Sequence, residues 1–165
     1  MRLDHLPALA TKRLALRPLV LADADAFRAM TDHPAVTAAV HFLASPFTLA
    51  AAEGLIAGDG DGRDCFWGVW RQGGNDLLGT IGTHLRGTAE IEIGYWFAPA
   101  SQGQGIATEA AGAILAALHD AYPDCIVYAE CRPDNEPSWR LLQRLGFRHH
   151  GVAGARPGRA RLVLL

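Results

Sequence analysis

Residues 101–110 constrain the fold of this chain more than any other segment, because they combine a tight turn, a potential anion site and the start of a helix. The apolar run before them, 91–97, is typical of a buried strand, and the Ala- and Leu-rich run after them predicts a helix. Gly103 and Gly105 allow the backbone to turn sharply and bring its N–H groups close to a ligand. Because a helix N-terminus also presents free N–H groups and a positive dipole end, the segment suits a pyrophosphate.

Glycines at a strand-to-helix turn do not by themselves identify a phosphate site. They are often present for backbone shape alone. A dinucleotide-binding turn would need a third small residue where Thr108 stands, and acidic residues such as Asp124 do not follow a clear second strand of that fold. A phosphate-binding lysine loop is excluded, because no Gly-Lys-Ser/Thr occurs and Lys12 is the only lysine.

The segment resembles the acyl-CoA pyrophosphate loop of the GNAT superfamily of N-acetyltransferases. The family pattern Arg/Gln-x-x-Gly-x-Gly/Ala is matched by Gln102, Gly105 and Ala107. Further blocks carry the same resemblance in family order, and together they cover nearly the whole chain: 11–18, 78–82, 93–99, 135–138 and 145–147. Within the superfamily the sequence most resembles the Rim-type branch, which includes the ribosomal-protein N-terminal acetyltransferases.

The resemblance implies one α/β domain over residues 1–165. We expect the GNAT fold: a mixed central sheet of about six to seven strands, flanking helices, and a cleft where the fourth and fifth strands splay apart. The hydrophobic pattern predicts strands near 14–17, 65–71, 77–85, 89–97, 125–131, 147–151 and 161–165. It predicts helices at 21–31, 48–57, 106–119 and 137–144, and a connector rather than a calcium loop at 58–62, where the acidic spacing is missing.

The resemblance implies that acetyl-CoA is the co-substrate. Its pyrophosphate is expected on Gln102, Gly103, Gln104, Gly105, Ile106 and Ala107. Free backbone N–H groups at Tyr95, Trp96 and Phe97 are expected to bind the pantetheine arm and the thioester oxygen, while their side chains pack in the core. Asn135 matches a coenzyme-contacting asparagine of the family, and it is equally a good helix cap.

The catalytic residues are less clearly specified than the coenzyme loop. Glu92 and Glu130 are alternative general bases on strands that flank the cleft, and either one equally fits a salt-bridged strand residue. Ser138 matches a position that assists the leaving thiolate in Rim-type enzymes, or it is a plain helix-entry serine. Many members carry a tyrosine acid seven residues after the asparagine, where this chain has Leu142. A thiol of pKa about 8.5 leaves without a strong acid.

The expected reaction is direct attack of a primary amine on the thioester through a tetrahedral intermediate, with no acyl-enzyme. A modest base favours an α-amine, pKa about 8, over a lysine amine at about 10.4. The expected acceptor is the α-amine of a protein N-terminus, with a small-molecule amine as the alternative. Residues 32–47 are expected to form one wall of its site, with His33 and His41 more typical of a surface loop than of catalysis. A non-catalytic acyl-CoA-binding module and a partner-binding protein remain as alternatives.

Composition limits the partners and the location. A net charge of −2 without a basic run argues against nucleic acid. No stretch approaches the roughly 20 apolar residues of a membrane span, and no signal peptide is visible. The three cysteines fit a reducing cytoplasm. His149 and His150 lack partner ligands at metal spacing, so we expect no metal site. Monomer and homodimer both remain open.

Overall fold

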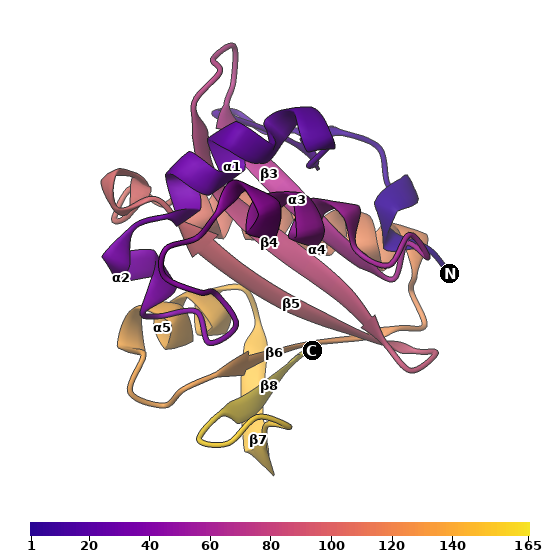
Figure 1. Cartoon of the computed structure of the whole chain (residues 1–165). Coiled ribbons are helices and arrows are strands. Elements are labelled where there is room, and N and C mark those ends of the chain that lie inside the picture. Colours follow the sequence, from indigo (N-terminus) through magenta and orange to yellow (C-terminus); the bar gives the residue numbers. More distant parts are fainter.

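A mixed eight-stranded sheet runs through the molecule in the order β1-β2-β3-β4-β5-β6-β8-β7 (Figure 1). The computed structural model describes all 165 residues. The strands are β1 Leu9–Ala10, β2 Leu14–Pro18, β3 Asp64–Arg71, β4 Leu77–Arg86, β5 Glu90–Phe97, β6 Ile126–Cys131, β7 Phe147–Ala153 and β8 Ala160–Leu164. The α/β prediction is confirmed, and the expected six to seven strands are eight because the two-residue β1 pairs with β2.

Helices cover both faces of this sheet (Figure 1). They are α1 Ala24–Thr31, α2 Pro34–Thr37, α3 Leu49–Ala57, α4 Ile106–Ala121 and α5 Glu136–Arg144. The helix predicted over 21–31 begins instead as a 3-10 turn at Leu21–Asp23, and Pro34 starts the short α2, which the sequence pattern did not predict. Proline suits a first helical turn because its missing N–H would be unpaired there. None of the helices combines the length and the apolar character that spanning a membrane requires.

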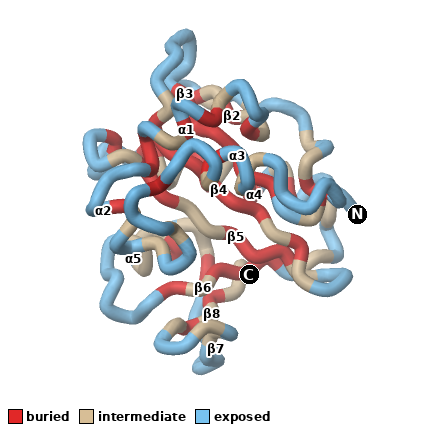
Figure 2. The backbone as a smooth tube through the Cα atoms, viewed as in Figure 1, coloured by how far each residue is buried: buried red, intermediate tan, exposed pale blue.

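The two faces of the sheet have separate cores. The larger core packs α4 against the sheet through residues such as Trp67, Ile81, Ile91, Ile114 and Leu118. The smaller core lies on the opposite face under α1 and α3, and includes Phe27, Phe47, Phe66 and Trp96. Figure 2 shows the buried residues gathered along the central strands and the exposed ones along the loops and the outer helix faces. Because they are packed between two cores, the central strands fix the positions of the functional groups that they carry.

The sheet opens between β5 and β6, which are its only parallel neighbours. β5 pairs with β6 from Glu90 to Ile93 and no further, although β5 continues along β4 to Phe97. Beyond Ala129, β6 pairs only with β8, through Glu130 and Cys131. The second half of β5 therefore has one free edge, at the place where the sequence predicts the splay.

Candidate active site

The loop before α4 and the first turn of that helix contain a run of unpaired backbone N–H donors. Gly103 and Gly105 have φ of +73° and +74°, a left-handed conformation that favours glycine, and Gly105 is the N-cap of α4. The N–H groups from Gly103 to Thr108 donate to no protein acceptor, and the first α4 hydrogen bond runs from Glu109 N to Gly105 O at 3.0 Å. Such a run at the positive end of a 16-residue helix is an anion site.

The side chains of this loop bind nearby backbone carbonyls or pack in the core, and they leave the space in front of the backbone N–H groups open. Gln102 Nε2 donates to Phe97 O at 3.2 Å, and Gln104 Nε2 donates to Ala100 O at 2.8 Å. Ile106 is buried in the core under α4, and Ala107 packs against that core. A Cβ on Gly103 would meet nothing within 4 Å. Of the predicted pyrophosphate residues, Gly103 to Ala107 therefore have open backbone N–H groups, whereas Gln102 N donates to Pro99 O at 3.2 Å and is not available to an anion.

The free edge of β5 supplies two more open donors. Ala98 N donates to Leu78 O on the β4 side, and Ile126 N donates to Ala89 O on the β6 side, each at 2.9 Å. Because hydrogen-bond direction alternates along a strand, the N–H groups of Tyr95 and Phe97 point to the β6 side, where β6 has diverged. These two groups fit the expected role toward a thioester.

Trp96 differs from its two neighbours in this respect. By the same alternation its N–H points to β4, where Trp96 lies opposite Thr80. Its side chain donates from Nε1 to Thr31 Oγ1 at 2.9 Å and stacks on Phe27, with ring centroids 6.0 Å apart. The predicted core role of the Trp96 side chain therefore holds, and the open backbone donors are those of Tyr95 and Phe97.

Alternation also separates the candidate side chains between the two faces of the sheet. Phe97 and Cys131 belong to the α4 core and Tyr95 packs against it, whereas Trp96 belongs to the core under α1 and α3. Because successive strand residues face opposite sides, the two candidate bases, on even-numbered positions of β5 and β6, lie on the α1 and α3 face.

Glu92 and Glu130 are joined by one guanidinium. Arg156 Nη1 donates to Glu92 Oε1 at 2.5 Å and to Glu130 Oε2 at 2.9 Å. Arg86 Nε donates to the other Glu92 oxygen at 3.0 Å. The Glu92 and Glu130 side chains are only 8% and 3% exposed. Burial alone would raise the pKa of Glu92, but hydrogen bonds and charge from Arg156 and Arg86 outweigh burial and hold that pKa below its usual range.

The Glu130 carboxylate also holds the chain segment that carries Arg156. Its oxygens accept from Ala155 N at 2.5 Å and from Arg156 N at 3.2 Å. Sequence reasoning missed Arg156, because its partners lie 64 and 26 residues away and no local pattern joins them. The visible signal was only the Arg-Pro-Gly turn between the two closing strands.

His41 lies in the electrostatic field of this same cluster. Partial burial, together with the positive charges of Arg156 and Arg159, lowers the pKa of His41, and Glu92 and Glu130 oppose that shift. The neighbouring Phe42 is 47% exposed and meets the Trp96 ring edge to face, with centroids 5.7 Å apart. Two residues of the predicted acceptor wall are therefore linked to this face of the sheet, His41 through the charges of the cluster and the exposed Phe42 through its contact with Trp96.

Ser138 lies on the opposite face of the sheet, beside the free edge of β5. Its Oγ is 2.7 Å from the Tyr95 hydroxyl, which is a hydrogen bond, and its backbone N donates to Asn135 Oδ1 at 3.3 Å. Asn135 is therefore the N-cap of α5. Burial raises the pKa of Tyr95, so its hydroxyl stays protonated. Leu142, at the usual tyrosine position, is fully buried and offers no proton.

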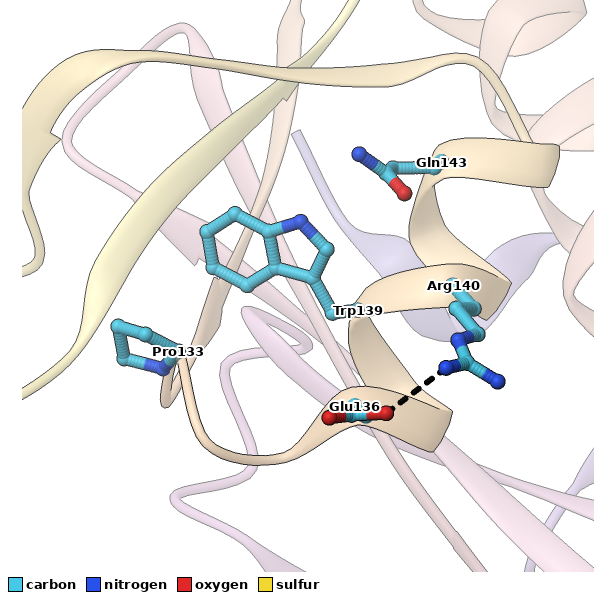
Figure 3. Close-up of a pocket in the computed structure, with 5 residues that line it drawn as sticks. All are labelled: Pro133, Glu136, Trp139, Arg140 and Gln143. Atoms are coloured by element: carbon cyan, nitrogen blue, oxygen red, sulfur yellow. Dashed lines mark hydrogen bonds and ion pairs between the residues drawn. The ribbon is translucent and has the colours of Figure 1, made fainter.

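A shallow hollow lies on the outer side of α5. Pro133, Trp139, Gln143 and the ion pair between Glu136 and Arg140, 2.8 Å apart, line it (Figure 3). It contains none of the residues that the sequence singles out for catalysis or coenzyme binding. The candidate active site is therefore defined by open backbone donors and paired side chains rather than by this hollow.

Comparisons with known proteins agree with this geometry. The model of the acetyltransferase (GNAT) domain family matches residues 13–148. The uncharacterized N-acetyltransferase YoaA of Bacillus subtilis (strain 168) is 32% identical over 152 residues, which are 88% of this chain and 85% of that protein. The uncharacterized N-acetyltransferase p20 of Bacillus licheniformis is 28% identical over 151 residues, which are 87% of this chain and 84% of that protein.

Solved structures share the fold along almost the whole chain. A GNAT-family acetyltransferase from Bacillus anthracis superposes with a TM-score of 0.82 at 24% identity, covering 96% of this chain and 98% of that one. RimL, a ribosomal L7/L12 α-N-protein acetyltransferase in complex with coenzyme A, superposes with a TM-score of 0.82 at 17% identity, covering 95% and 96%. The chain therefore belongs to the GNAT family and is an N-acetyltransferase that uses acetyl-CoA as its co-substrate.

Proposed function

We propose that this enzyme is a Rim-type acetyltransferase whose acceptor is the α-amine of a protein N-terminus. Structural neighbours whose names support this branch include RimL, the RimJ of Mycobacterium smegmatis and a putative ribosomal-protein-serine acetyltransferase from Vibrio cholerae. Their identities of 17%, 22% and 22% carry the fold alone, so the choice of acceptor rests on the chemistry of this site.

The observation that carries the proposal is the separation of functional groups on either side of the free edge of β5. Open donors lie along the edge and in the loop before α4, carboxylates lie on one face, and a hydroxyl pair lies on the other. Acetyl-CoA supplies the acetyl group as a thioester. The backbone N–H groups from Gly103 to Ala107 would hold its pyrophosphate, and the N–H groups of Tyr95 and Phe97 would hold the pantetheine arm and polarise the carbonyl.

On the acceptor face, Glu92 or Glu130 receives the amine proton, through water. Glu92 is the better candidate, because its partners are arginine side chains that can rotate, whereas Glu130 also holds two backbone N–H groups of the 155–156 turn. A carboxylate whose pKa is held low is a weak base. It therefore suits an amine that is partly neutral at pH 7. An α-amine, with a pKa of about 8, meets this condition, whereas a lysine amine, with a pKa of about 10.4, is almost wholly protonated.

On the opposite face, Ser138 assists departure of the thiolate. Because Tyr95 stays protonated, its hydroxyl can donate to Ser138 Oγ and leave the serine proton directed away from Tyr95. Ser138 then stabilises the thiolate with a hydrogen bond, and no strong acid is needed for a thiol of this pKa. Tyr95 is a positioning residue in this arrangement. Asn135 caps α5, which fixes the backbone that carries Ser138.

The surroundings of the acceptor site disfavour polycations among the small-amine alternatives. Arg156 and Arg159 act on His41 from this side, and His41 itself has a lowered pKa. A polyamine would bring several positive charges toward Arg159, which forms no ion pair, and toward Arg156, whose charge Glu92 and Glu130 share, while a peptide brings one ammonium group followed by neutral backbone. The exposed ring of Phe42 offers apolar contact to the first side chain of such a peptide.

The experiment that tests this proposal is CoA thiol release across a panel of acceptors. The panel contains short peptides with free N-termini, the same peptides with blocked N-termini and an internal lysine, free amino acids, polyamines and aminoglycosides. We expect turnover only with free peptide N-termini. Selective turnover of a small amine, or of the internal lysine, would overturn the acceptor assignment.

A further inference from the structure

Arg13 contacts the loop before α4, although it lies 91 residues before Gln104 of that loop in the sequence. It follows β1 and precedes β2. Its Nη1 donates to Gln104 O at 2.9 Å, and its Nε donates to Glu109 Oε2 at 2.6 Å. Thr11 Oγ1 donates to the other Glu109 oxygen at 2.6 Å, and the Arg13 backbone N donates to that oxygen at 3.1 Å. The guanidinium is therefore fixed beside the loop.

Part of this guanidinium has no protein partner. Of its five N–H donors, Nε and one on Nη1 are used, so both donors on Nη2 remain free. Nη2 lies 3.5 Å from the point where a Cβ on Gly105 would stand. Gly105 is the left-handed residue that begins the free N–H run at α4. The Arg13 side chain is 44% exposed, so an anion can reach it from solvent.

The charges around the loop need this arginine. Glu109 lies in the first turn of α4, where a carboxylate stabilises the helix but repels an anion bound at the same end. Hydrogen bonds from Thr11 and Arg13 are the main reason that the pKa of Glu109 is lowered, so Glu109 is charged at neutral pH. Arg13 neutralises this charge, and Glu109 in turn holds the guanidinium with Nη2 beside Gly105.

We propose that Arg13 is a phosphate-binding residue of the acetyl-CoA site, with its free Nη2 on the pyrophosphate that the N–H groups from Gly103 to Thr108 receive. This inference rests on the assignment of the 102–107 loop to the pyrophosphate. The ligand group is a diphosphate ester, and the 3′-phosphate of the coenzyme is the other phosphate within the same molecule. A guanidinium forms charge-assisted hydrogen bonds with such oxygens.

The test is calorimetric binding of CoA and of 3′-dephospho-CoA to the full chain and its variants. Arg13→Gln is expected to weaken CoA binding about 10- to 100-fold, the range for losing a hydrogen bond to a charged group. Lys12→Gln is the matched control, because Lys12 is the exposed neighbour and forms no ion pair. It is expected to change affinity less than twofold. Unchanged affinity in Arg13→Gln would overturn the proposal.

Two further comparisons separate a direct contact from other causes. The double variant Arg13→Gln/Glu109→Gln removes both charges. If its CoA affinity stays as low as that of Arg13→Gln, Arg13 contacts the ligand. If its CoA affinity returns to that of the unaltered protein, Arg13 only neutralised the charge of Glu109, and the proposal is overturned. The same fold-loss with 3′-dephospho-CoA supports the pyrophosphate. A loss confined to intact CoA would move the contact to the 3′-phosphate and overturn this assignment.

A last arm separates the failure of this inference from the failure of the loop assignment. Gly105→Glu would place a carboxylate against the bound pyrophosphate and is expected to abolish CoA binding. Gly87→Glu, at a turn with φ of +61° and open space around it, is the control for backbone strain. If Gly105→Glu abolishes CoA binding and Arg13→Gln leaves it unchanged, the role of Arg13 in binding the pyrophosphate is excluded, while the loop assignment stands. If Gly105→Glu binds normally, the loop assignment itself fails.

Discussion

Arg156 places one guanidinium between two carboxylates that come from neighbouring strands. Such an arrangement favours the ionised form of Glu92, because hydrogen bonds and charge from Arg156 and Arg86 lower its pKa. At the scale of single residues, the proposed acceptor face is therefore a set of paired charges, in which Glu92 and Glu130 both bind arginine through their carboxylate oxygens.

Removing the Glu92 carboxylate is expected to slow acetyl transfer. Glu92→Gln keeps the shape but cannot take a proton, so we expect kcat/KM for the acceptor to fall about 10²- to 10⁴-fold. The loss should shrink as pH rises toward the pKa of the amine, because more of the amine is then neutral without help. The measurement is kcat/KM from pH 6 to 9.

Glu90→Gln is the control for this comparison. Glu90 lies on the same strand and pairs with Arg161 at 2.6 Å, outside the proposed site. It is expected to behave as the unaltered enzyme. A large loss in Glu130→Gln with little change in Glu92→Gln would transfer the base role to Glu130.

The hydrogen bond between Tyr95 and Ser138 predicts coupled effects on the chemical step. Ser138→Ala and Tyr95→Phe are each expected to lower kcat about fivefold or more, the effect of one hydrogen bond of about 1 kcal/mol, with KM for acetyl-CoA unchanged. The double variant should lose no more than Ser138→Ala alone, because both changes remove one interaction. Independent, multiplied losses would show that Tyr95 does not act through Ser138.

At the scale of elements, α5 combines a capping role with a proposed coenzyme role. Asn135 caps α5 through Ser138 N, and the same side chain is proposed to contact acetyl-CoA. Asn135→Ala is expected to cost about 1 kcal/mol of stability, whereas Asn135→Asp keeps an equally good cap. Chemical denaturation and CoA titration of both variants separate the roles. If Asn135→Asp restores both stability and affinity, the amide has no part in binding the coenzyme.

The elements themselves were largely predictable, because their signals are local. β5 and α4 follow from an apolar run, two glycines and an Ala-rich segment that adjoin one another. β1 was missed because two residues become a strand only by pairing with β2, and α2 because a four-residue helix depends on Pro34 and on the cap formed by His33. Arg156 and Arg13 acquire their roles through partners as far as 64 and 96 residues away, which no spacing rule connects.

For the whole molecule, carboxylates with lowered pKa values set the response to acid. The Arg17 hydrogen bonds lower the pKa of Asp23, His84 does so for Asp64, and Thr11 and Arg13 do so for Glu109. A carboxyl group whose pKa is lower when folded contributes stability above its unfolded pKa, and that contribution disappears as pH falls through the folded value. The molecule should therefore lose stability in acid.

Thermal unfolding measured from pH 7 to pH 3 checks this expectation. The midpoint should stay nearly level until the ordinary values of 4.5 for glutamate and 3.8 for aspartate are approached, and then fall. Asp23→Asn should unfold at a lower temperature at pH 7 and show a shallower decline in acid, because it removes one of these contributions. A midpoint that rises as pH falls would contradict the assignment.

The alternation of side chains along β5 has a consequence for the order in which substrates bind and products leave. In the proposed arrangement, the amine and its proton acceptor lie on one side of the sheet and the thiol departs on the other, so the two substrates would have separate entrances. CoA should then compete with acetyl-CoA in product-inhibition kinetics without competing with the amine, and a spent coenzyme need not leave before the acetylated product does. Competition between CoA and the amine would mean that the two share one entrance after all.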